Sequence, residues 1–163
     1  MSTKNVTAPA VLPTFTATPE LREAFQRALT DVTALSLVGK QVHWNVVGQG
    51  FRSIHLNLDV VVDIARAASD EIAERMRALN AVPDGRPAAV ADSSLPAAPA
   101  ELVIVSDAVD YAVSAINATV TTLREIHKVV DETDPMSSGI IEDIALKLEQ
   151  QAWFLASQNY AAE

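Results

Sequence analysis

Two histidines and three carboxylates in the first half of the chain have the residue types and the spacing of a metal site. The chain contains no cysteine, so a thiolate site is excluded and any metal must be held by imidazole and carboxylate groups. Such a mixed set of nitrogen and oxygen ligands suits iron, manganese or zinc, and open positions on iron would let it meet an oxidant. The candidate ligands are His43, His55, Asp59, Asp70 and Glu74.

The last four of these residues are spaced so that they share one face of a helix. His55 and Asp59 lie four positions apart, as do Asp70 and Glu74, and an α-helix turns by about 100° per residue. From Asp59 to Asp70 the rotation is about 1,100°, which is only about 20° more than three full turns. The two pairs are nevertheless separated by roughly 16 Å along the helix axis, so one chain cannot bring both pairs to a common ion.

A two-fold pairing of two chains would remove this conflict. If two such helices cross antiparallel near residues 64–65, the His–Asp pair of one copy faces the Asp–Glu pair of the other, and a closed dimer contains two equivalent sites. His43 would join the same site if the chain reverses sharply at Gly48 and Gly50, because glycine tolerates the backbone angles of such a turn.

A purely structural interpretation stays open on the spacing alone. A lone histidine on a helix usually has a structural role, and carboxylates along a helix usually form a solvated face. Asp59, however, lies between Leu58 and Val60 in an apolar run, and burying carboxylates near an interface without a cation is costly.

The elements that must position these residues are four long helices, predicted over residues 19–45, 53–80, 103–132 and 135–158. Thr18-Pro19-Glu20 and Asp134-Pro135 each combine a capping side chain with proline at the first helical position. Apolar residues recur at helical spacing along the first two helices. Those expected to face inward are Leu21, Phe25, Leu29, Val32, Leu35, Ile54, Leu58, Val61, Ala65, Ala68, Ile72, Met76 and Leu79.

The segment of residues 81–101 contains four prolines and one glycine and is too long for a hairpin between adjacent helices. It can carry the chain along the length of the bundle, so that the third helix lies parallel to the second. Bundles with one such long crossover include the ferritin-like bundles. We therefore expect an all-α, ferritin-like four-helix bundle over residues 18–159, with a flexible arm at residues 1–17 and a short tail at residues 160–163.

Composition limits the function classes. The 163 residues are 49% hydrophobic but only 5% aromatic, with five glycines, which predicts one helical domain with a sizeable core. The chain has 12 basic and 21 acidic residues, a formal net charge of −9, so it repels nucleic acid and anionic lipid and attracts cations. The apolar runs are far too short to span a membrane and residues 1–15 do not resemble a secretory signal, so a cytoplasmic protein is expected.

The motif around the candidate ligands resembles the signature of the Dps proteins, the starvation-induced mini-ferritins. All five iron-binding positions of that family are matched in residue type and spacing, and the likeness covers residues 18–159. The sequences from Lys40 to Gly48 and from Ala73 to Arg77 are most similar to the actinobacterial branch. The residues that carry the likeness are His43-Trp44-Asn45, Gly48, Phe51, His55, Asp59, Asp70 and Ala73-Glu74-Arg75.

The resemblance implies a cytoplasmic, hollow shell of twelve subunits with iron-oxidising centres between two-fold-related chains. His43, His55 and Asp59 would come from one chain, Asp70 and Glu74 from its neighbour. The implied activity is oxidation of Fe(II), at a centre of one or two iron ions, with hydrogen peroxide preferred over oxygen. The ferric product is stored as an oxide mineral core, and the activity protects the cell from oxidative damage. The chain has no Glu-x-x-His motif, which the di-iron centres inside ordinary ferritin-like bundles use.

Further residues acquire candidate roles from the same resemblance. Trp44 directly follows His43 and could donate an electron to stray oxidants, which would remove them. Trp153 matches a second tryptophan position of the family and could do the same. For both, packing is the alternative role. The family has acidic pores on three-fold axes, through which Fe(II) would pass inward. The candidate pore residues here are Asp131, Asp134, Glu142 and Asp143, although acidic residues at a helix start are also favoured by the helix dipole.

Two other functions stay open. Paired histidines and carboxylates also hold metal ions that activate water, so a metal-dependent amide or ester hydrolase is possible. A DNA-compacting protein is the other alternative. Here the first 17 residues carry only Lys4 and nothing basic follows Lys147, so DNA binding is not expected unless assembly gathers Arg52, Arg75, Arg77 and Arg86 into a patch.

Overall fold

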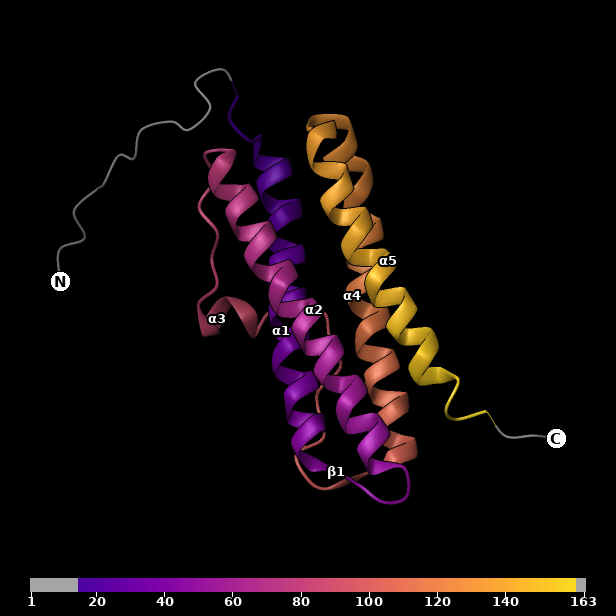
Figure 1. The fold of residues 1–163 in the computed structure, drawn as a ribbon. Helices are drawn as coiled ribbons and strands as arrows, with labels where there is room; N and C mark the ends of the chain where they lie inside the picture. The colour runs from indigo at the N-terminus through magenta and orange to yellow at the C-terminus, as the bar shows by residue number, and fades with distance from the viewer. Residues whose placement is uncertain (1–14, 161–163) are drawn as a thin grey trace, which may run out of the picture.

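Four long helices make up most of the molecule, which is known from a computed structural model that describes residues 15–160 (Figure 1). They are α1 (Pro19–Asn45), α2 (Phe51–Ala78), α4 (Val105–Thr133) and α5 (Ser138–Ala156). A short helix, α3 (Pro87–Val90), lies in the segment between α2 and α4, and a 3₁₀ turn (Pro135–Ser137) precedes α5. The four expected helices are therefore present, with ends within three residues of the prediction.

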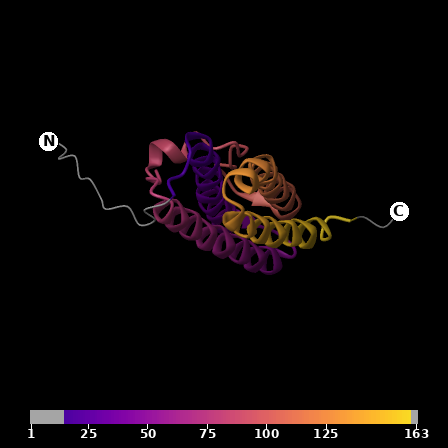
Figure 2. The same ribbon diagram turned by 90° about the horizontal axis from the view of Figure 1, so that it is seen from above.

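The helices form the ferritin-like bundle that the sequence predicts. The chain descends α1, returns along α2, and is carried back by residues 79–104 so that α4 runs parallel to α2 (Figure 1). Seen along the bundle, α2 and α5 form one side, and α1 and α4, with the crossover, form the other (Figure 2). In the part of the chain that the structure describes, no helix is long and apolar enough to cross a membrane.

The start of α1 and the turn before α2 have the local structure expected from their residues. The Thr18 hydroxyl accepts a hydrogen bond from the backbone N–H of Leu21 at 3.2 Å, which caps α1. Gly48 and Gly50 have φ values of 111° and 84°, in the region that residues with a side chain rarely adopt. The two glycines thus allow the sharp reversal that returns α2 along α1.

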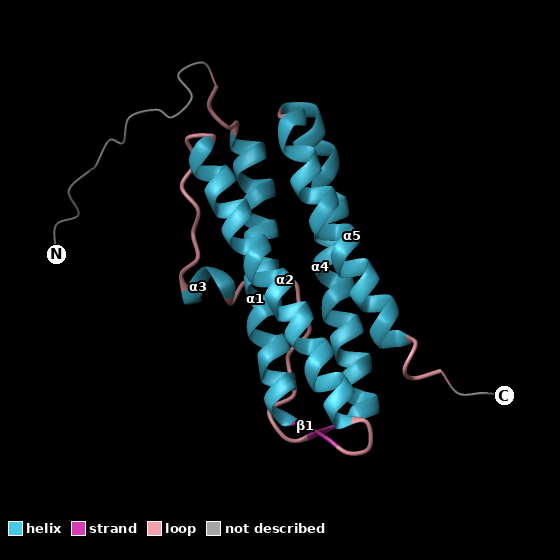
Figure 3. Ribbon diagram, viewed as in Figure 1, coloured by secondary structure: helices cyan, strands magenta, loops and turns pink. Residues whose placement is uncertain are grey.

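A short parallel β-ladder, which the helical pattern of the sequence does not predict, joins this turn to the end of the crossover. β1 (Val46–Val47) pairs with β2 (Val103–Ile104), with Val46 opposite Val103 (Figure 3). The ladder holds the chain that enters α4 against the chain that leaves α1. It therefore fixes the end of the bundle at which both histidines of the candidate site lie.

The core fills the space between the four helices. Every position predicted to face inward on α1 and α2 is buried. The two helices approach each other closely at Gly39, where an added Cβ atom would lie 2.9 Å from Cγ2 of Val62. This contact lies one turn of α1 before His43, so it helps to set the separation of α1 and α2 at the site.

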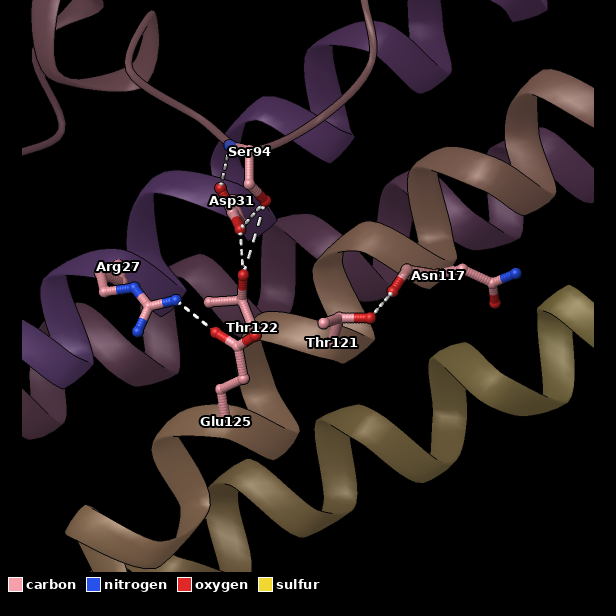
Figure 4. A network of polar contacts seen from close by, with 7 residues as sticks. All are labelled: Arg27, Asp31, Ser94, Asn117, Thr121, Thr122 and Glu125. Atoms are coloured by element: carbon pink, nitrogen blue, oxygen red, sulfur yellow. Dashed lines mark hydrogen bonds and ion pairs between the residues drawn. The ribbon is translucent and has the colours of Figure 1, made fainter.

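Side-chain hydrogen bonds attach the crossover to the bundle (Figure 4). The buried carboxylate of Asp31 accepts hydrogen bonds from Ser94 N and Oγ, at 2.9 and 2.6 Å, and from Thr122 Oγ1 at 2.6 Å. Three donors compensate the loss of water around this carboxylate. Arg27 and Glu125 add an exposed ion pair between α1 and α4 at 2.7 Å. These contacts place the crossover on the α1–α4 side of the bundle.

Two local expectations need correction. Asp134 precedes a 3₁₀ turn, and its side chain does not cap a helix; its carboxylate instead accepts hydrogen bonds from Arg75 and Ser137. Residues 15–17 of the predicted arm belong to the fold: Ala17 is buried and its N–H donates to Leu79 O at 3.0 Å. The rest of that arm, and residues 161–163 of the predicted tail, lie outside the described residues.

Candidate metal centre

The two histidines of the motif hold each other in a defined orientation. Nδ1 of His43 lies 2.9 Å from the backbone oxygen of His55, and Nδ1 of His55 lies 3.0 Å from that of His43. The rings stack with centroids 3.6 Å apart and an angle of 22° between their planes. Because a carbonyl oxygen only accepts hydrogen bonds, both Nδ1 atoms carry a hydrogen. In the neutral form of each ring the lone pair is then on Nε2, the arrangement that metal-binding histidines use.

Asp59 completes a group of three possible ligands. It lies one turn after His55 on α2, and ligand atoms of His43, His55 and Asp59 all fall within 4.8 Å of one another. His43 is buried, whereas His55 and Asp59 are half-buried. Phe51 packs against His55 with ring centroids 5.0 Å apart. The group is thus packed against the bundle on the side of His43 and open to solvent on the side of α2.

The carboxylate of Asp59 is paired with a lysine side chain. Lys40, three residues before His43 on α1, forms an ion pair with Oδ1 of Asp59. The hydrogen bond from Lys40 is the main reason why the pKa of Asp59 lies below its ordinary value. The carboxyl group is therefore ionised at neutral pH, as a metal ligand must be.

Asp70 and Glu74 lie farther along α2, with exposed side chains. Neither belongs to the group of three, which is the only such group found among residues 15–160. The single chain therefore brings together three of the five predicted ligands. The separation follows from the rise of the helix, about 1.5 Å per residue, over the eleven residues between Asp59 and Asp70.

Large apolar side chains are exposed next to the three gathered ligands. Trp44 follows His43 and is 70% exposed, and Leu56 and Val60 flank the His55–Asp59 turn with exposures of 47% and 45%. Leu56 and Val60 lie one helical turn apart on α2, and large apolar side chains that are exposed together in this way are common at sites of protein association.

The four candidate pore residues lie around the junction of α4 and α5. Asp131, Glu142 and Asp143 are exposed, and their carboxylates accept hydrogen bonds from Ser138, His127 and Lys147 respectively. Their charges face solvent, although Glu142 and Asp143 each have a basic neighbour.

Asp134 differs from the other three because it is 7% exposed. Arg75 Nη2 lies 2.7 Å from its Oδ2, and Arg75 Nε donates to Ser137 Oγ at 2.7 Å. This ion pair joins α2 to the start of α5. Passage of an ion along Asp134 would require this internal pair to open.

Sequence reasoning gave no role to Lys40 or to Asp31. The position of Lys40 carries a signal, since a residue three before a ligand lies on the same helix face. No such sequence signal exists for Asp31, because its partners Ser94 and Thr122 lie 63 and 91 residues away in the chain.

Comparison with known proteins agrees with this fold. Residues 22–160 match the ferritin family, described as a ferritin-like domain. The chain is 28% identical to the DNA protection during starvation protein of Mycolicibacterium smegmatis over 88% of the chain and 79% of the relative. It is 33% identical to the fine tangled pili major subunit of Haemophilus ducreyi, over 83% of the chain and 72% of that protein.

Solved structures give the same result. Dps from Mycobacterium smegmatis superposes with a TM-score of 0.84 at 26% identity and covers 93% of this chain and 96% of that one. Dps from Microbacterium arborescens in its high iron form has a TM-score of 0.78 at 34% identity, with 88% and 97% covered. The chain belongs to the Dps family of ferritin-like proteins. Membership in the Dps family places it among proteins that oxidise and store iron.

Proposed function

We propose that this Dps-family chain is a ferroxidase and iron store whose metal centre is completed by a second copy of the chain. The observation that carries the proposal is the group of His43, His55 and Asp59, with both Nδ1 atoms engaged and both Nε2 atoms left with lone pairs. Two imidazoles and a carboxylate suit iron, and the open side leaves room for further ligands and an oxidant.

The missing ligands would come from a two-fold-related neighbour. Asp70 and Glu74 lie on the same stripe of α2 as Asp59 but too far away to reach its ion. An antiparallel crossing of two α2 helices would bring one chain's Asp70 and Glu74 to the other's histidines. The exposed apolar side chains of Trp44, Leu56 and Val60 support an interface there. Further copies would close a shell of twelve subunits, as the resemblance implies.

The proposed chemistry uses Fe(II) as substrate. Two Fe(II) ions each give one electron to hydrogen peroxide, which takes up two protons and becomes two water molecules, so no hydroxyl radical is released. The histidines and Asp59 of one chain, with Asp70 and Glu74 of its neighbour, would hold the ions. Trp44, next to His43 and largely exposed, is placed to donate an electron to stray oxidants. The ferric product would be stored inside the shell.

Access of Fe(II) to the interior is assigned to the exposed acids at the α4–α5 junction. Asp131, Glu142 and Asp143 offer surface carboxylates that attract a divalent cation. Asp134 has a bracing role in the isolated chain, through its buried pair with Arg75.

The test is peroxide-dependent iron oxidation by the assembled protein. Fe(II) is added without oxygen, hydrogen peroxide follows, and ferric absorbance is recorded. The wild type should oxidise two Fe(II) per peroxide, and Asp59→Ala should lose at least about tenfold in rate, because removing even an outer partner of a metal ligand costs about that much. Glu101→Ala, at an exposed position of the crossover, is the control and should behave as the wild type. Oxidation by the wild type no faster than that of Fe(II) in buffer would refute the proposal.

The same preparations separate the hydrolase alternative. Hydrolysis of acyl substrates is measured with the wild type and with Asp59→Ala. If hydrolysis is present and Asp59→Ala abolishes both activities, one centre serves both reactions; we expect no hydrolysis from the wild type.

A further inference from the structure

Lys40 is paired with the carboxylate of Asp59, which is one of the ligands of the proposed metal centre. It lies on the face of α1 that carries His43, and its ammonium group forms an ion pair with Oδ1 of Asp59. The side chains of Lys40 and Asp59 are 20% and 38% exposed, so the pair is partly shielded from water. An ion pair that water screens only in part is stronger than one on the open surface.

The oxygen that Lys40 occupies also faces one of the two histidines. Oδ1 of Asp59 lies 3.4 Å from Nδ1 of His43. A metal ion bound by a carboxylate lies about 2.0–2.2 Å from the oxygen. An ammonium group on the same oxygen would then lie in direct contact with a second positive charge, and their repulsion is strong at such a distance. A divalent cation on Oδ1 therefore competes with the Lys40 ammonium group for Asp59.

We propose that Lys40 is an internal cation that competes with Fe(II) for Asp59 and thereby sets the affinity of the centre for metal ions. This inference rests on the function proposed above. Lys40 keeps its charge throughout; it is displaced, and its flexible four-carbon stem lets the ammonium group turn to solvent. A singly charged cation gains less from Asp59 than a divalent one does, so it cannot offset the loss of the ion pair. Lys40 thus favours divalent ions over sodium and potassium.

The test measures cation binding, without turnover. Cobalt(II), which has the charge of Fe(II), is titrated calorimetrically into the assembled wild type and into Lys40→Met, which keeps the stem and removes the charge. Lys40→Met should bind cobalt(II) about tenfold more tightly, which corresponds to ~1.4 kcal/mol. Lys40→Arg keeps a charge on Asp59 and should bind no more tightly than the wild type.

Lys128→Met is the matched control. Lys128 forms an exposed i,i+4 pair with Glu132 at 3.7 Å, so this variant changes the net charge equally without touching the centre, and its affinity should equal that of the wild type. If Lys40→Met binds cobalt(II) as the wild type does, or more weakly, Lys40 is a structural partner of Asp59 and the inference is wrong. If the wild type itself binds no cobalt(II) and oxidises no Fe(II), the proposed function fails, a result distinct from an unchanged affinity in Lys40→Met.

Discussion

His43 and His55 each bond the other's backbone oxygen through Nδ1, at 2.9 and 3.0 Å, while their rings stack 3.6 Å apart. The two residues come from different helices, so this reciprocal pair holds the end of α1 against the start of α2. It also selects the tautomer in which both Nε2 atoms have free lone pairs. One contact therefore serves the packing of the helices and the chemistry of the centre.

A centre shared between chains predicts complementation in mixed shells. Asp59→Ala and Glu74→Ala should each abolish most oxidation, because each removes one ligand of every site. When equal amounts of the two variants are dissociated and assembled together, random pairing restores about a quarter of the sites, since half of the dimers are mixed and each has one intact site. Ferric absorbance after peroxide addition measures this recovery. Mixed shells as inactive as either parent would rule out a shared centre.

The close approach of α1 and α2 at Gly39 predicts a position-specific effect on stability. Gly39→Ala places a methyl group 2.9 Å from Val62 and should lower the free energy of unfolding by about 1–3 kcal/mol, as overpacking does. Gly139, in the first turn of α5, has open space at the same position, so Gly139→Ala should instead stabilise by about 0.4–1 kcal/mol. Urea unfolding of both variants tests this contrast, and an equal effect at the two sites would contradict it.

The buried carboxylate of Asp31 predicts that the crossover is held by hydrogen bonds. Asp31→Ala leaves Ser94 and Thr122 without their acceptor and should cost about 2–4 kcal/mol in the free energy of unfolding. Glu125→Ala removes the exposed pair with Arg27 and should cost no more than about 1 kcal/mol. Urea unfolding curves give both values. A cost for Asp31→Ala as small as that for Glu125→Ala would show that packing alone holds the crossover.

The charge of the chain predicts that DNA is not retarded in a gel at physiological salt. The net charge is −9, and two arginines of the candidate patch, Arg75 and Arg86, are paired with Asp134 and Asp84. Little positive charge is thus left to release counterions from DNA. Gel retardation is measured with and without magnesium, and a variant with six lysines added at the N-terminus is the positive control. Retardation of DNA by the wild type in the absence of magnesium would contradict this expectation.

The sequence by itself determined the helices and the stripe of ligands. The spacing of apolar residues predicted α1 and α2, and it also predicted which of their residues are buried. It could do so because a helix repeats with a fixed angle and rise, so its buried face appears as a pattern in the local sequence. The same rule put Asp59 and Asp70 on one stripe and too far apart for one ion. The glycines at 48 and 50 marked the reversal, since positive φ values favour glycine.

Tertiary structure alone decided which side chains meet across elements. The stacking of His43 on His55 and the ion pair of Lys40 with Asp59 join α1 to α2, and the pair of Arg75 with Asp134 joins α2 to the turn after α4. The β-ladder at Val46 likewise joins segments 57 residues apart in the chain. Such contacts depend on how far each helix slides and rotates against its neighbour, and packing of the whole core fixes that geometry. Periodicity places a residue on a face, whereas its partner depends on the neighbouring helix that the fold brings to that face.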